Sequence, residues 1–276
     1  MEQIEKAIEK IKGNISDWER PDVYKACLAS IDLTTLNSTD TNIKVAGMID
    51  KVNGFHDKFP QYPSVAAVCV YPNFASLVRE KLNVDNVKIA VVAGAFPTSQ
   101  SFEEIKVSEC KMAAERGADE IDIVLALNKF LASDSVGTYN EICNIKSAIG
   151  RKHLKVILET GALKNKEQIE SAAELAIKAG ADFIKTSTGK MEPAATPEAA
   201  YIMCSCIKKH YEKTGLKIGF KPAGGISTPQ EALLYYAITE SILGKEWLNP
   251  GLFRIGASRL ANNLLSILER TTVSYF

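Results

Sequence analysis

The sequence predicts a single α/β domain, residues 1–276, folded as a closed (β/α)8 TIM barrel with an extra helix at its N-terminus. The length of 276 residues is ordinary for one such barrel. Short β-branched runs alternate with longer helical patterns eight times, and neither a linker nor a change in composition divides the chain. An open doubly wound sheet is the alternative, because a sequence does not show whether a sheet closes.

The first segment, residues 1–26, is expected to form a helical extension of the barrel. Ile4, Ile8, Ile11 and Ile15 recur at helical spacing and form one apolar stripe. We expect this stripe to pack on the body of the protein, with a contact between two copies in a homodimer as the alternative. The segment mixes Glu with Lys and has no apolar run, so it does not resemble a secretory signal.

The barrel strands are expected in eight apolar, β-prone runs. These runs lie near residues 27–33, 64–71, 88–94, 120–126, 154–160, 182–187, 217–223 and 252–258. Two capping boxes predict helix starts between them, Ser101 with Glu104 and Thr228 with Glu231. Residues 270–276 have no apolar period after the last helix and are expected to form a flexible tail.

Composition and charge exclude several classes of protein. Lys plus Arg equals Asp plus Glu at 33 each, so no net field attracts nucleic acid or anionic lipid. The apolar runs are strand-sized, too short to cross a membrane. Six cysteines and three histidines show neither disulfide nor metal-ligand spacing. We therefore expect a cytoplasmic protein with reduced cysteines, no metal and no cofactor, whose partners are small molecules.

Charged residues occupy inward positions on four consecutive strands. Because strand residues alternate faces, Asp122, Lys155, Lys185 and Lys221 are all expected to point into the barrel, and Glu159 shares their phase. A second ammonium about 5 Å from a lysine lowers its pKa by about 2 units, which favours a Schiff-base nucleophile. A structural ion network and lysines that reach out to water are the alternatives.

A phosphate site is expected beside these lysines. Glycine-rich loops follow the last strands, and a helix begins after "IGAS", so backbone N–H groups and a helix dipole are available to an anion. The loops after strands 7 and 8 are where barrel enzymes usually hold phosphate. The candidate residues are Thr188, Gly189, Lys190, Gly224, Gly225, Gly256 and Ser258.

Several motifs together resemble one enzyme family. "ADFIKTSTGK", "GFKPAGG", "GADEIDIV", "LKVILETG", "DLTTLN" and "FRIGAS" are similar to segments of deoxyribose-phosphate aldolase, between about Ile31 and Ser258. The resemblance implies reversible cleavage of 2-deoxy-D-ribose 5-phosphate to D-glyceraldehyde 3-phosphate and acetaldehyde, without a cofactor, in deoxyribose phosphate catabolism. It also implies that Lys185 forms the Schiff base, Lys221 is the second lysine, Asp122 moves protons, and Lys155 is a further active-site lysine.

The sequence departs from the family's pattern at the phosphate loops. Ser227 stands where many relatives carry an arginine, and Arg259 follows "GAS" where a small or polar residue is common, so Arg259 is a further phosphate-binding candidate. The stretch "VVAGAFPTSQ" also differs from the family's third loop. Some relatives end in a tyrosine that assists proton transfer, whereas here Tyr275 is penultimate and Phe276 follows.

Two other functions stay open at this point. One is a different Schiff-base sugar-phosphate aldolase, such as a transaldolase-like enzyme. The other is a non-catalytic phosphosugar-binding relative, against which the intact set of Asp122, Lys185 and Lys221 argues.

Overall fold

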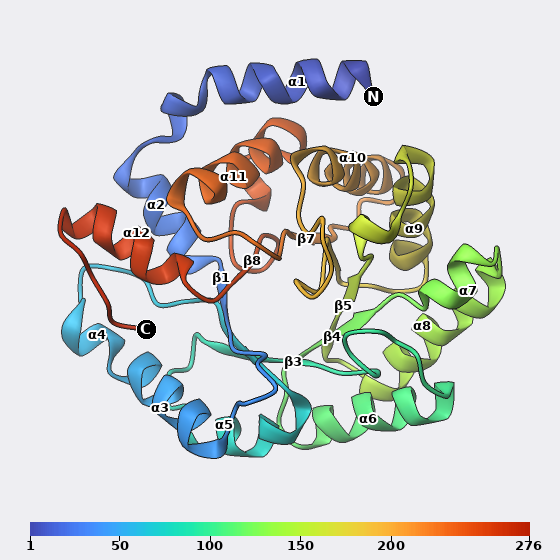
Figure 1. Ribbon diagram of the computed structural model, residues 1–276, viewed down its shortest axis with the longest axis horizontal. Helices are drawn as coiled ribbons and strands as arrows, with labels where there is room; N and C mark the ends of the chain where they lie inside the picture. Colours follow the sequence, from blue (N-terminus) through green and yellow to red (C-terminus); the bar gives the residue numbers. More distant parts are fainter.

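The computed structural model, which describes residues Met1–Phe276, is a barrel of eight parallel strands surrounded by helices (Figure 1). Neighbouring strands follow the order β7-β6-β5-β4-β3-β2-β1-β8. Their bounds are β1 (Ile31–Thr34), β2 (Ala67–Val70), β3 (Lys88–Val92), β4 (Glu120–Val124), β5 (His153–Ile157), β6 (Phe183–Lys185), β7 (Gly219–Lys221) and β8 (Ile255–Ala257). Isolated bridges from Phe220 to Phe253 and from Ala223 to Gly256 bring the two ends of the sheet together. The predicted TIM barrel is confirmed, and a doubly wound order is excluded.

Twelve helices and four short 3₁₀ segments connect and cover the strands. The helices are α1 (Glu2–Gly13), α2 (Pro21–Ala29), α3 (Asn42–Asn53), α4 (Phe55–Lys58), α5 (Ala75–Lys81), α6 (Glu103–Glu115), α7 (Leu127–Leu131), α8 (Ser135–Ile149), α9 (Lys166–Lys178), α10 (Pro197–Thr214), α11 (Pro229–Leu243) and α12 (Leu260–Glu269). The 3₁₀ segments are η1 (Ile15–Trp18), η2 (Pro72–Phe74), η3 (Thr160–Ala162) and η4 (Lys245–Trp247). None of the helices combines the length and the apolar character that a membrane span needs.

The strands are shorter than the apolar runs that predicted them. The run near 27–33 begins inside α2, where Cys27 and Leu28 are buried in the last helical turn, and only its second half is β1. The run near 154–160 ends as a strand at Ile157, because Glu159 adopts a left-handed conformation with φ of 53°. Buried apolar residues therefore continue past the strand ends into the loops that form the site.

The N-terminal helix packs on its own chain. Ile4, Ile8 and Ile11 are buried, Ile15 is half-buried, and α1 contacts α10 and α11. The stripe of isoleucines thus covers the outside of the helical layer, at the edge of the barrel shown in Figure 1. A homodimer contact through this helix stays a prediction.

One of the two predicted capping boxes is present. The Thr228 side chain accepts from the Glu231 N–H, and the Glu231 carboxylate accepts from the Thr228 N–H, at the start of α11. The other box is wrong, because α6 begins only at Glu103 and Ser101 still belongs to the preceding loop. There the Ser101 N–H bonds the carbonyl of Ser99, a residue with φ of 56°.

The C-terminal segment 270–276 has more packing partners than its sequence indicated. The Asn262 side chain accepts from the N–H groups of Tyr275 and Phe276 and donates to the Phe276 carbonyl, each at 2.9 Å. The Phe276 ring stacks on Phe55 at 5.5 Å between centroids. The Tyr275 hydroxyl donates to the carbonyl of Lys51 at 2.7 Å. The segment is thus packed beside α12 and α4 (Figure 1), and the flexibility expected of it stays a prediction.

The barrel interior has an apolar side and a charged side. Ala67, Cys69, Ala90 and Val92 of β2 and β3 form a small cluster with Leu36, separate from the main core between strands and helices. Strands β4 to β7 instead turn ionisable side chains inward. The interior on that side is the candidate site.

Candidate active site

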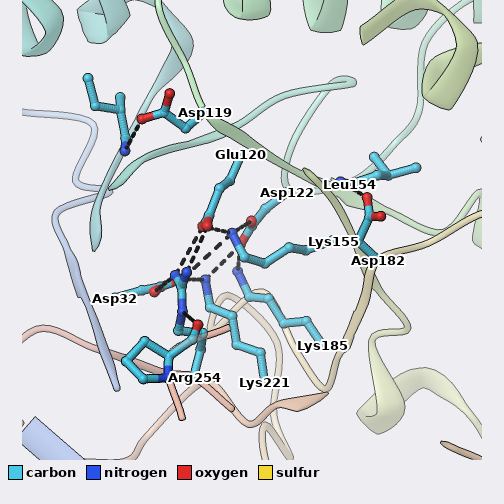
Figure 2. Close-up of polar contacts among 12 residues, drawn as sticks. Asp32, Asp119, Glu120, Asp122, Leu154, Lys155, Asp182, Lys185, Lys221 and Arg254 are labelled. Carbon is cyan, nitrogen blue, oxygen red and sulfur yellow. Dashed lines mark hydrogen bonds and ion pairs between the residues drawn. The ribbon is translucent and has the colours of Figure 1, made fainter. Parts of the chain in front are cut away.

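Four of the five ionisable residues predicted to face the interior, Asp122, Lys155, Lys185 and Lys221, lie together, as Figure 2 shows. Asp122 on β4 is level with Lys155 on β5, and Lys185 on β6 is level with Lys221 on β7. All four are buried, with Lys185 3% exposed and the other three 0%. Strand alternation brings them to one point, because each occupies an inward position of its strand.

Asp122 is the centre of the group. Its Oδ2 atom accepts from Lys185 Nζ at 2.9 Å and from Lys221 Nζ at 2.8 Å. Its Oδ1 atom accepts from Lys155 Nζ at 2.9 Å. Because Lys185 and Lys221 share one oxygen, their ammonium nitrogens cannot be farther apart than the sum of those two distances. The close pair of lysines expected from the sequence is therefore present.

Three further charged residues complete the network and were missed from the sequence. Glu120, Asp32 and Arg254 are all buried in the same interior. Arg254 donates to Asp32 at 2.7 Å and to Glu120 at 2.7 and 3.0 Å. Glu120 is two residues before Asp122 on β4, and Asp32 alternates with Ile31 and Leu33 on β1, so strand phase would have found both carboxylates.

The surroundings act differently on the pKa values of the lysines. Burial lowers the pKa of Lys185, the Asp122 carboxylate opposes this, and the ammonium of Lys221 adds to the lowering. Burial also acts to lower the pKa of Lys221 and of Lys155, but the carboxylates beside each outweigh it and raise the pKa. Lys185 is thus the one of these three lysines whose pKa is lowered. The expectation that a neighbouring ammonium is the main cause needs correction, because burial is the larger one.

A cavity of about 260 Å³ opens above this network at the C-terminal ends of the strands. Lys185 lines it, whereas the other six members of the network do not. All eight phosphate-site candidates line it as well, namely Thr188, Gly189, Lys190, Gly224, Gly225, Gly256, Ser258 and Arg259. Thr34, Asn37 and Ser227, which the sequence did not predict as phosphate-site residues, also line the cavity.

Glycine is required where the loops of this cavity meet. A Cβ atom on Gly224, whose φ is 93°, would stand 2.6 Å from Ala194 Cβ and 3.2 Å from the Cα of Gly189. A Cβ atom on Gly256 would stand 2.7 Å from Ala223 Cβ. Larger residues would push the loops apart, so glycine lets the backbone close tightly around a small ligand.

The loop after β6 is fixed from both sides. Glu159, expected to face the interior, instead accepts from the N–H of Thr188 at 3.1 Å and from its hydroxyl at 2.5 Å. The Lys190 ammonium reaches across the cavity and donates to the carbonyl of Leu36 at 2.6 Å. Arg259 is exposed at the start of α12 and makes no hydrogen bond or ion pair with the protein. Two cations and a helix N-terminus therefore border the cavity.

No group of three or more His, Cys, Asp and Glu side chains is placed to hold a metal ion. The Asp32, Glu120 and Asp122 carboxylates are each bonded to lysine or arginine instead. The chemistry that the arrangement offers is that of a buried amine with a shared carboxylate, below a rim bordered by two cations and a helix N-terminus.

Comparisons with known proteins agree with this geometry. Residues 26–262 match the model of the DeoC/LacD family of aldolases. A Caenorhabditis elegans protein named "putative deoxyribose-phosphate aldolase" is 43% identical over 268 residues, which is 96% of this chain and 88% of that protein. Among solved structures, "QR15, an Aldolase" matches with 27% identity and a TM-score of 0.72, over 88% of this chain and 96% of its own. Deoxyribose phosphate aldolase from Aeropyrum pernix shares the fold at 24% identity, with a TM-score of 0.69 over 93% of this chain and 96% of its own.

The family match spans most of the barrel, from the last turns of α2 to the first turn of α12, and includes every residue of the interior ion network. The chain therefore belongs to the DeoC/LacD family of aldolases.

Proposed function

We propose that this protein is a class I aldolase that reversibly cleaves 2-deoxy-D-ribose 5-phosphate to D-glyceraldehyde 3-phosphate and acetaldehyde, through a Schiff base on Lys185. The observation that carries the proposal is that Lys185 alone among the interior cations lines the cavity. Of the three interior lysines it is also the one whose pKa is lowered overall, chiefly by burial, whereas neighbouring carboxylates raise the pKa of Lys155 and Lys221. An amine that is both reachable and easily deprotonated is what attack on an aldehyde requires.

The proposed reaction begins at the aldehyde carbon of the open-chain sugar. The Lys185 amine adds to this carbon, and the carbinolamine loses water to give an iminium. The iminium accepts the electron pair of the bond between C2 and C3 as that bond breaks and the C3 hydroxyl loses its proton, which releases glyceraldehyde 3-phosphate. The enamine left on Lys185 is protonated at carbon and hydrolysed to acetaldehyde, which regenerates the amine.

Asp122 is the proposed proton carrier in these steps. Its Oδ2 atom lies 2.9 Å from the Lys185 nitrogen and 2.8 Å from Lys221. The carboxylate can therefore accept a proton from the reacting nitrogen or return one to it. Lys221 or a water molecule can exchange protons with Asp122 between these steps. Lys155 bonds Asp122 at 2.9 Å and Glu120 at 2.5 Å, which suits holding Asp122 in place.

The rim of the cavity is the proposed phosphate site. The backbone of the loops at Gly189, Gly224 and Gly225 and the N-terminus of α12 border it, and such N–H groups bind phosphate well. Arg259 and Lys190 supply the positive charge, although Lys190 would first release the Leu36 carbonyl. The corresponding place in metabolism is deoxyribose phosphate catabolism, with no metal or cofactor and in the cytoplasm.

Reductive trapping tests the proposal directly. Incubation with acetaldehyde and borohydride, followed by peptide mapping, should add an ethyl group to Lys185 and leave Lys221 unmodified. Lys185→Met should abolish both labelling and cleavage of deoxyribose 5-phosphate. Labelling at Lys221 would reverse the assigned roles.

Product analysis separates this reaction from that of another Schiff-base aldolase. Release of acetaldehyde from deoxyribose 5-phosphate supports the proposal. Turnover of dihydroxyacetone phosphate, or transfer of a dihydroxyacetone unit between sugar phosphates as in a transaldolase-like enzyme, would favour another Schiff-base aldolase. Binding of phosphosugars without any labelling would indicate a non-catalytic relative.

A further inference from the structure

Arg254 is a fully charged residue in the barrel interior that the proposed reaction does not use. It is 3% exposed, lies one residue before β8 and does not line the cavity. Its Nη1 atom donates to Asp32 Oδ1 at 2.7 Å, and its Nη2 atom donates to Glu120 Oε1 at 2.7 Å. Burying a guanidinium is costly even when it is paired, so this position calls for an explanation.

Two routes of contacts connect Arg254 to the reactive lysine (Figure 2). Asp32 bonds Arg254 with one oxygen and Lys221 with the other. Glu120 bonds both Arg254 and Lys155. Lys221 and Lys155 then both donate to Asp122, which holds Lys185. Arg254 thus lies at one end of a continuous buried network and Lys185 at the other.

The network contains one more cation than anion when every group is ionised. Its cations are Lys155, Lys185, Lys221 and Arg254, and its anions are Asp32, Glu120 and Asp122. In a buried site an unbalanced charge is unfavourable, and loss of one proton restores the balance.

That proton comes from Lys185. An arginine does not deprotonate in proteins. Lys221 pairs with Asp32 and Asp122, and Lys155 pairs with Glu120, Asp122 and, at 3.8 Å, Asp32, so each is held by at least two carboxylates. Lys185 bonds Asp122 alone.

We propose that Arg254 is a positioning residue for the aldolase reaction, because its permanent charge in this network forces Lys185 to be the neutral member. The inference rests on the proposed function, since it assigns Lys185 as the nucleophile. Without Arg254 the remaining three lysines would balance the three carboxylates, and Lys185 would retain its proton.

The other elements around Lys185 add no charge to this balance. Cys69 on β2 is buried, and burial raises the pKa of its thiol, so the thiol stays neutral. Ala90 and Val92 of β3 do not titrate, and Lys88 at the start of that strand is exposed.

On the solvent side, Lys190 and Arg259 line the same cavity as Lys185, but both are exposed, where water screens their charge. Glu159 is buried and bonded to Thr188. These three groups are the same in every variant considered below.

The test is the pH dependence of trapping at Lys185 with acetaldehyde and cyanoborohydride, read by peptide mass spectrometry. In Arg254→Gln the midpoint of labelling should rise by about one pH unit, the size expected for a unit charge about 10 Å away at an effective dielectric of about 20. In Glu120→Gln, which increases the positive surplus, the midpoint should fall. Arg254→Lys, which keeps the charge, should show the midpoint of the unmodified protein.

A double variant supplies the matched control and covers the case in which Arg254→Gln does not fold. Glu120→Gln with Arg254→Gln removes one charge of each sign, so its midpoint should return to that of the unmodified protein. These two variants differ only at Arg254, so the difference between their labelling midpoints tests the effect of the Arg254 charge even if Arg254→Gln alone does not fold. Midpoints that stay constant across the set, or that move in the same direction in both single variants, would overturn it. Absence of labelling in the unmodified protein at every pH would instead refute the proposed Schiff base on Lys185.

Discussion

At the scale of single residues, the number of carboxylates around each interior lysine corresponds to the direction in which its pKa is shifted. Lys221 lies between Asp32 and Asp122, and these carboxylates raise its pKa against the effect of burial. Lys185 has one carboxylate, and burial lowers its pKa. Two chemically identical side chains on neighbouring strands therefore suit different tasks in the proposed reaction, Lys185 as the nucleophile and Lys221 as its positively charged neighbour.

The first prediction at this scale is that Lys221→Leu moves the pH dependence of iminium formation to higher pH. Loss of the Lys221 charge removes one cause that lowers the pKa of Lys185, so more of the amine stays protonated at neutral pH. Turnover should fall strongly. The measurement is borohydride trapping of acetaldehyde over a pH series, with circular dichroism to verify folding, because breaking a buried pair costs about 3–5 kcal/mol. An unchanged pH profile with slower turnover would leave Lys221 as a proton carrier only.

The second prediction concerns Arg259, whose guanidinium borders the cavity without a partner in the protein. Arg259→Ala should raise KM for deoxyribose 5-phosphate about 10- to 100-fold, since a charge-assisted hydrogen bond contributes roughly 1.5–3 kcal/mol. Cleavage of unphosphorylated deoxyribose serves as the control and should change little. Equal losses with both substrates would mean that Arg259 is structural.

At the scale of elements, helix ends and loops determine which side chains reach the cavity. The start of α12 presents Arg259 to the rim, while Asn262 in the first turn of the helix holds the C-terminal segment on the outside of the barrel. The same helix thus separates the proposed phosphate site from Tyr275. In this position the Tyr275 hydroxyl bonds the carbonyl of Lys51 and is not part of the cavity lining.

The prediction at this scale is that Tyr275→Phe acts on stability rather than on proton transfer. Loss of the hydrogen bond to Lys51 should lower the free energy of unfolding by about 0.5–1.5 kcal/mol. Hydrogen exchange at the acetaldehyde methyl group, followed by NMR in deuterium oxide, should stay near the level of the unmodified protein. A large loss of exchange in Tyr275→Phe, matched by deletion of residues 272–276, would show that the tail leaves its docked position and enters the site during turnover.

At the scale of the whole molecule, the buried carboxylates of the site make the free energy of unfolding depend on pH. Burial acts to raise the pKa of Asp32, Glu120 and Asp122, but the lysine and arginine charges beside them outweigh it, so all three pKa values are lowered. Unfolding returns these carboxyls to ordinary values near pH 4. Their stabilising contribution is complete above that pH and is lost as the pH falls from there through the lower values of the folded state.

The corresponding prediction is a steep acid transition. Below pH about 4, three such carboxyls decrease the free energy of unfolding by up to about 4 kcal/mol per pH unit. Urea unfolding between pH 5 and 3 measures this slope. The Glu120→Gln, Arg254→Gln double variant has one carboxyl fewer and should show a slope smaller by about 1.4 kcal/mol per pH unit. Identical slopes in the two proteins would mean that Glu120 is not ionised in the folded state.

Local sequence patterns by themselves determined the barrel and the inward direction of Lys155, Lys185, Lys221 and Asp122. Both follow from short-range physics, namely the alternation of strand side chains and the repeated order of strand and helix. The glycine-rich loops were visible for the same reason, since positive φ and close approach favour one residue type. The same rule, applied to β1 and to the start of β4, would also have reached Asp32 and Glu120.

Only the tertiary structure decided how these charges pair. The alternation of side chains along a strand tells which face a residue occupies, but it does not give the distance between side chains on different strands. It showed that Arg254 joins Asp32 to Glu120 and that Glu159 leaves the interior to hold Thr188. It also placed the C-terminal tail on α12, through contacts between residues distant in sequence. The proposed reactivity of Lys185 depends on which carboxylates its neighbours contact, and those contacts exist only when the strands are assembled into the barrel.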